Sequence, residues 1–198
     1  MTRALAPFSP APRFLFYNVL SGTIPPELGG LTSLQALDLS VNQISGTIPD
    51  ALSSLSSLKG LGLNDDWLTG SIPPSLGSLS SLQGIALYHN GLSGTIPASL
   101  GSLSSLQALD LHTNGLSGTI PASLSSLSSL QALYLNNNAL TGTIPATLSN
   151  LTCLVYLCAA REPARWPRTA RKAQPAPHHG LRNRWTDACA PPLPAAGG

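Results

Sequence analysis

The sequence predicts a solenoid, a stack of short coils that share one continuous apolar core. The first observation is a repeat, because leucines recur every 24 residues, at Leu31, Leu55, Leu79, Leu103, Leu127 and Leu151. The second is that seven apolar positions in each of the five full units, residues 31–150, hold only Leu or Ile. The third is composition: 9% of residues are charged, and glycine and proline each occur 18 times. Such a composition is typical of a repetitive, turn-dense architecture.

Each unit contains a short strand followed by several turns. In the fourth unit, Leu109 and Leu111 alternate with Asp110 and His112, which is the two-residue period of a strand. The other apolar positions are separated by Gly and Pro, so the chain must turn repeatedly to bring them inward. Stacking buries this apolar side and aligns the strands as a parallel sheet. We expect parallel strands on one face and turns, 3-10 helices or irregular segments on the other.

A polar position after each strand is expected to form a structural ladder. Its residues are Asn18, Asn42, Asp66, Asn90, Asn114 and Asn138. An amide both donates and accepts, so it can bridge backbone groups that are left free where the coil turns. Asp66 is the exception, because a carboxylate cannot donate unless it is protonated. We therefore expect a weaker rung there, or a raised pKa.

The repeat resembles a known family. The segments LDLSVNQISGTIP (Leu37–Pro49) and LDLHTNGLSGTIP (Leu109–Pro121) resemble the plant-specific subclass of leucine-rich repeats, which is marked by a strand followed by Gly-x-Ile-Pro. The subclass occurs in ectodomains of receptor-like kinases, in receptor-like proteins and in polygalacturonase-inhibiting proteins. The resemblance implies an α/β-type leucine-rich-repeat solenoid whose strand-lined face recognises proteins, peptides or glycans, usually outside the cell or at its surface.

The resemblance covers residues 18–157 and leaves two flanking segments. Residues 1–17 are expected to be poorly ordered, and prolines and Arg13 interrupt what would be the apolar run of a signal peptide. Residues 158–198 are rich in Ala, Pro and Arg and are expected to be disordered. This tail has seven Arg or Lys against two acidic residues. It can be interpreted as a basic nucleic-acid-binding patch or as non-domain sequence, and we favour the second interpretation.

The candidate binding site lies on the outward positions of the strands, which stack in columns and vary between units. One column is Ser40, Asn64, Tyr88, His112 and Asn136; a second is Asp38, Gly62, Ala86, Asp110 and Tyr134; a third is Val41, Asp65, His89, Thr113 and Asn137. Variation on one face of a repetitive scaffold can encode specificity, and exposed Tyr and His are good contact residues. The candidate ligand-binding residues are Asp38, Tyr88, His89, Asp110, His112, Tyr134 and Asn136. The alternative is that they are ordinary solvated strand residues.

The sequence indicates recognition without catalysis. No Ser–His–acid set, phosphate loop or pair of carboxylates stands out, so the chain is not expected to be an enzyme or to need a cofactor. A metal held by His89, Asp110 and His112 is a minor alternative, because three ligands without a fourth make a weak zinc site. A protein or peptide partner is expected, a glycan is possible, and neither nucleic-acid binding nor a transmembrane segment is expected.

Two other functions remain open at this point. One is an intracellular leucine-rich-repeat adaptor. The other is a surface that matches a lattice such as ice, because hydroxyl residues recur once per coil at Thr23, Thr47, Ser71, Thr95, Thr119 and Thr143.

Trp67 follows the ladder position and is either a contact residue at the rim or an aromatic ring covered by the next turn. Asn150 begins an Asn-Leu-Thr acceptor pattern for N-glycosylation.

Overall fold

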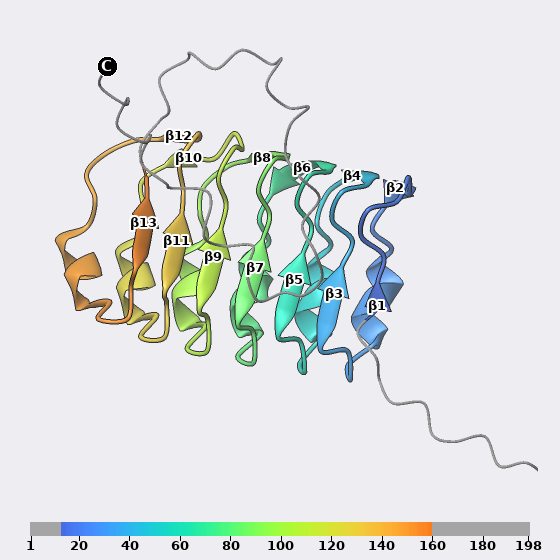
Figure 1. Cartoon of the computed structure of the whole chain (residues 1–198), viewed down its shortest axis with the longest axis horizontal. Coiled ribbons are helices and arrows are strands. Elements are labelled where there is room, and N and C mark those ends of the chain that lie inside the picture. The colour runs from blue at the N-terminus through green and yellow to red at the C-terminus, as the bar shows by residue number, and fades with distance from the viewer. Residues whose placement is uncertain (1–12, 160–198) are drawn as a thin grey trace, which may run out of the picture.

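Seven short strands within residues 13–159, one from each successive coil, line one face of the molecule. The computed structural model describes residues 13–159, and the strands are β1 (Arg13–Phe14), β3 (Ala36–Asp38), β5 (Gly60–Gly62), β7 (Gly84–Ala86), β9 (Ala108–Asp110), β11 (Ala132–Tyr134) and β13 (Tyr156–Cys158). They pair in parallel in chain order and stand side by side in Figure 1. Leu61 pairs with Leu37 on one side and with Ile85 on the other. The 24-residue repeat therefore keeps inward side chains in one row.

The sheet begins earlier in the chain than we expected. Residues 13–17 were assigned to a poorly ordered segment, but β1 pairs with β3, and the Leu15 N–H donates to the Asp38 carbonyl at 2.9 Å. Backbone groups make these hydrogen bonds, so an edge strand can form without the side chains of a full repeat. The tail was expected to begin at residue 158, but Cys158 completes β13 and pairs with Tyr134 of β11. The remaining predictions for the flanking segments concern residues 1–12 and 160–198 and lie outside the described residues.

Within residues 13–159, six 3-10 helices occupy the side opposite the seven strands (Figure 1). They are η1 (Pro26–Gly30), η2 (Asp50–Ser54), η3 (Pro74–Ser78), η4 (Ala98–Ser102), η5 (Ala122–Ser126) and η6 (Ala146–Asn150). A proline with φ between −57° and −69° precedes each one. The Ile-Pro of the repeat signature thus places a residue with fixed φ where the chain enters the helix. Parallel strands on one face and 3-10 helices on the other confirm the predicted fold class.

A second row of strands was not predicted. The strands β2 (Ser21–Thr23), β4 (Gln43–Gly46), β6 (Trp67–Ser71) and β8 (Gly91–Ser93) form a four-stranded parallel sheet, and β10 (Ser117–Gly118) pairs with β12 (Ala139–Leu140). These strands run along the upper edge of the molecule in Figure 1. Each coil offers only one inward apolar residue here, such as the buried Ile44, before a glycine with positive φ, such as Gly46 at +78°. The alternating pattern is therefore too short to be recognised as a strand.

The apolar core runs through the middle of the stack. All but four of the thirty-five repeat Leu and Ile side chains are buried. The exceptions are Leu31, Leu34, Leu140 and Ile144, which belong to the first and last full units. Exposure reaches 43% at Leu31 and 56% at Ile144. Inner coils are covered on both sides by identical neighbours, so burial is complete only away from the ends.

The ladder amides bridge successive coils. The Asn90 Nδ2 donates to the Leu63 carbonyl of the preceding coil at 2.8 Å and to the Leu87 carbonyl of its own coil at 3.1 Å, while its Oδ1 accepts from the Leu68 N–H at 3.0 Å. Asn42, Asn114 and Asn138 make the same set of bonds. Asn18 is exposed and donates only within its own coil among the described residues.

Asp66 holds its rung with one oxygen. Its Oδ1 accepts from the Ile44 N–H at 3.0 Å, but its Oδ2 is buried and has no hydrogen-bond partner among the described residues. Burial, which outweighs the backbone N–H groups directed at the carboxylate, raises the pKa of Asp66 to about 6. A carboxylate therefore occupies a position whose surroundings suit an amide.

Candidate functional site: a ring cluster on the strand-lined face

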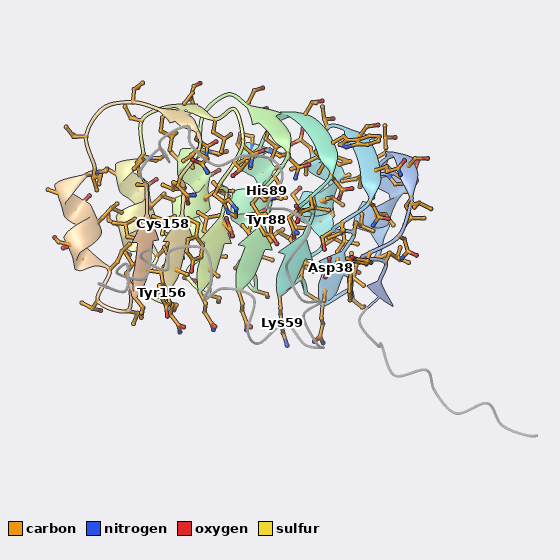
Figure 2. All side chains as sticks on the ribbon, turned by 45° about the horizontal axis from the view of Figure 1, so that its top comes forward. Asp38, Lys59, Tyr88, His89, Tyr156 and Cys158 are labelled. Atoms are coloured by element: carbon orange, nitrogen blue, oxygen red, sulfur yellow. The ribbon has the colours of Figure 1, made fainter. Side chains whose placement is uncertain are left out.

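Three rings gather near the middle of the strand-lined face. Tyr88 and His112 follow β7 and β9 at equivalent positions, and their rings stack with centroids 4.6 Å apart and planes 13° apart. The His89 ring meets both nearly edge-on, at 5.4 Å from Tyr88 and 5.0 Å from His112. Figure 2 shows Tyr88 and His89 together on this face. Two adjacent coils therefore supply one ring cluster, which we define as Tyr88, His89 and His112.

Two carboxylates orient the imidazoles of the ring cluster. The Asp65 Oδ1 lies 2.8 Å from the His89 Nδ1, and the Asp110 Oδ1 lies 2.5 Å from the His112 Nδ1. A neutral imidazole that donates from Nδ1 presents Nε2 as an acceptor, whereas a protonated one presents an Nε2–H donor. The cluster thus combines aromatic surface with two hydrogen-bonding groups held in place.

Asp65 was not among the candidate site residues. It stands one coil before His89 in the same column, at a spacing of 24 residues. The stacking of that column therefore indicated that Asp65 and His89 are neighbours. Both residues have positive φ, +56° for Asp65 and +52° for His89, as does every described residue of the column. Asp and His adopt this left-handed conformation more readily than most residues, and here it forms the turn that leaves the sheet.

The structure brings only part of the candidate set together. Asp110 joins the ring cluster through His112, whereas Asp38 lies apart, as Figure 2 shows, and accepts from the Ser40 N–H at 3.1 Å and the Ser40 hydroxyl at 2.5 Å. Asp38 and Ser40 thus satisfy each other locally, two coils before the first coil of the ring cluster.

The exposure of four candidates differs from the expectation that all are open contact residues, and the side chain of His112 is one of them, at 13% exposed. Asp110, Tyr134 and Asn136 are 4%, 1% and 9% exposed. Tyr134 packs with the small side chains of Ala108 and Ala132 and against Cys158, and burial followed by the charge of Asp110 raises the pKa of its phenol. The small side chains of Ala108 and Ala132 leave room for the Tyr134 ring to pack against them. The alternation of strand residues in the sequence does not reveal this packing.

The remaining motifs are placed as follows. Trp67 is 63% exposed and is therefore not covered by the next turn. Asn150, at the end of η6, is exposed, and so are the hydroxyl residues that recur once per coil. Within residues 13–159, no group of three or more His, Cys, Asp or Glu is arranged to hold a metal ion. No helix in the same range is long and apolar enough to cross a membrane.

Comparison with known proteins places this geometry in a family. The Leucine Rich Repeat family profile matches residues 33–55, 81–103, 105–127 and 129–151. Among solved structures, the chain is 34% identical to the LRR ectodomain of the receptor kinase SOBIR1 from Arabidopsis thaliana, with a TM-score of 0.63, covering 67% of this chain and 72% of that one. No curated protein sequence gives a match. The chain belongs to the plant-type leucine-rich-repeat family.

Other similar structures are receptors in complex with peptides. The plant peptide hormone receptor RGFR1 in complex with RGF2 is 43% identical, with a TM-score of 0.73, over 73% of this chain and 23% of that one. The Arabidopsis receptor kinase HAESA, in complex with the peptide hormone IDA and the co-receptor SERK1, is 39% identical, with a TM-score of 0.70, over 71% of this chain and 24% of that one. The chain thus spans about a quarter of the length of these receptor chains.

Proposed function

We propose that this chain is a non-enzymatic recognition module that binds a peptide across its strand-lined face, with the ring cluster as the main contact. The observation that carries the proposal is the cluster itself, three rings from two adjacent coils, in which carboxylates hold the two imidazoles. The similarity to peptide-hormone receptors supports it.

The ring cluster has the properties of a contact site. Tyrosine and histidine side chains offer a large contact area with two rotatable bonds each, so little conformational entropy is lost on binding. The Asp65 and Asp110 contacts reduce that loss further, because both imidazoles are oriented before a ligand arrives. From residue 18 to residue 157, one lysine stands against six acidic residues. A peptide with basic or hydrogen-bond-donating side chains therefore suits this face.

The test uses a displayed library of linear peptides selected on the full chain. Peptides that bind are then titrated by calorimetry against the triple variant Tyr88→Ala, His89→Ala, His112→Ala. We expect affinity to fall at least about a hundredfold, since aromatic anchors at the centre of an interface account for most of its binding energy.

A matched control removes three exposed side chains from the same region of the stack. The triple variant Gln83→Ala, Gln107→Ala, Gln131→Ala changes residues just before β7, β9 and β11 and should retain affinity. Circular dichroism should be unchanged in both variants. Peptides that bind both triple variants equally well would show that the ring cluster is not the contact site.

A further inference from the structure

We propose that the second row of strands forms a separate binding surface for a neutral, extended glycan, centred on Trp67. This goes beyond the peptide site, because it uses other strands and other side chains. The starting point is β6, in which Trp67, Thr69 and Ser71 are exposed while Leu68 between them is buried. The indole therefore shares one solvent-facing side of the strand with two hydroxyl groups.

The surface around Trp67 is uncharged. We define the hydroxyl face as the outward positions 67, 69 and 71 of β6 together with the equivalent positions of the coil before it and of the three coils after it. It consists of Gln43, Ser45, Thr47, Trp67, Thr69, Ser71, Gly91, Ser93, Thr95, Gly115, Ser117, Thr119, Ala139, Thr141 and Thr143. None of these side chains is ionisable, so the face lacks the cations that an anionic polymer needs. A neutral ligand rich in hydroxyl groups matches it.

The inner hydroxyls are oriented by the backbone. The Thr69 hydroxyl donates to the Gly46 carbonyl of the preceding coil at 3.3 Å, and the Ser93 hydroxyl donates to the Gly70 carbonyl at 3.4 Å. Ser45, Ser117 and Thr141 donate to the equivalent carbonyls. Because each proton is directed to the backbone, the oxygen lone pairs remain to accept hydrogen bonds from a ligand. The result is a regular row of acceptors.

These features together select a sugar chain. A pyranose ring has an apolar face of C–H groups, which can stack on the exposed indole, and a rim of O–H groups, which can donate to the acceptor row. Neighbouring strands lie about 4.8 Å apart, which is comparable to the length of one ring in an extended β-linked chain. Trp67, the one tryptophan of the hydroxyl face, then fixes where the sugar chain binds along a row that is otherwise periodic.

Calorimetry with cellohexaose, a neutral β-1,4-linked probe, tests the proposal on the full chain. We expect Trp67→Ala to weaken binding about tenfold or more and Trp67→Phe to recover part of it. Thr69→Val, which keeps the shape but removes one acceptor, should cost roughly threefold. Trp67 and Thr69 are exposed, so both variants should keep the wild-type circular dichroism spectrum.

The peptide-site variant separates this inference from the proposed function. Tyr88→Ala, His89→Ala, His112→Ala should bind cellohexaose normally, whatever it does to peptides. The proposal is overturned if cellohexaose does not bind, if Trp67→Ala binds it as tightly as the wild type, or if the peptide-site variant loses it. Thermal hysteresis in dilute solution, without cellohexaose binding and unaffected by Trp67→Ala, would instead make the hydroxyl face an ice-binding surface.

Discussion

Asp66 gives this solenoid an unusual dependence of stability on pH. Its pKa lies at about 6 in the folded chain, above the ordinary value of 3.8. A raised carboxyl pKa means that the folded state binds the proton more tightly than the unfolded state does. The resulting stabilisation is fully present below about pH 4 and is lost as the pH rises through about 6. The gap between the two values corresponds to about 3 kcal/mol.

We predict that Asp66→Asn raises the free energy of unfolding at pH 7 and has a smaller effect at pH 4. The amide can donate to backbone carbonyls as Asn90 does, and it carries no charge to bury. Urea denaturation of both proteins at several pH values measures the difference, which should grow by about 2 kcal/mol between pH 4 and pH 7. Asn114→Asp is the matched control. It should introduce the same pH dependence of the free energy of unfolding at the ladder position two coils after Asp66.

The sequence predicted the ladder and the exceptional character of Asp66 because both depend only on the donors and acceptors of one residue type. The ring cluster was predicted less completely. Columns placed Tyr88 and His112 next to each other, but the pairing of Asp65 with His89 and the burial of Tyr134 depend on side-chain rotamers. Those are determined by neighbours in other coils.

At the scale of the element, glycine determines how closely the 3-10 helices pack. A Cβ atom on Gly101 of η4 would lie 2.4 Å from the Ser123 carbonyl oxygen of η5, and one on Gly77 would lie 2.4 Å from the Ser99 carbonyl oxygen. Serine occupies the equivalent position in η2 and η5, and those helices are in looser contact with the ones that follow. The spacing of the helices therefore varies along the stack with this one residue.

We predict that Gly101→Ala lowers the free energy of unfolding by about 1–3 kcal/mol, because the clash is with backbone and cannot be relieved by a rotamer change. Gly30→Ala is the control, since nothing lies within 4 Å of its Cβ position, and it should change stability by less than about 0.5 kcal/mol. Thermal and urea unfolding measure both. Equal effects of the two substitutions would refute this account of helix spacing.

The two rows of strands show what the sequence can and cannot predict about elements. The first row was predicted because an alternating pair such as Leu109 and Leu111 recurs in every unit. The second row was missed because each coil contributes a single inward residue there, and the backbone pairing between coils, which makes it a sheet, leaves no pattern in the side chains.

At the scale of the whole molecule, periodicity explains both the certainty of the fold and the position of the site. The same 24-residue step buries the core and stacks the variable residues of adjacent coils, so Tyr88 and His112 necessarily become neighbours. Among the repeat Leu and Ile side chains, only Leu31, Leu34, Leu140 and Ile144, in the first and last full units, are not buried. In the proposed function, recognition depends on the few positions that break the repeat, while the repeat itself provides the scaffold.

The most direct test of the central claim is site-specific photo-crosslinking of a selected peptide. A benzophenone side chain is placed at position 88, in the ring cluster, or at position 107, an exposed glutamine just before β9. The account predicts crosslinking to the peptide from position 88, competed by the unlabelled peptide, and none from position 107. Efficient crosslinking from position 107, or none from position 88, would contradict recognition through the strand-lined face.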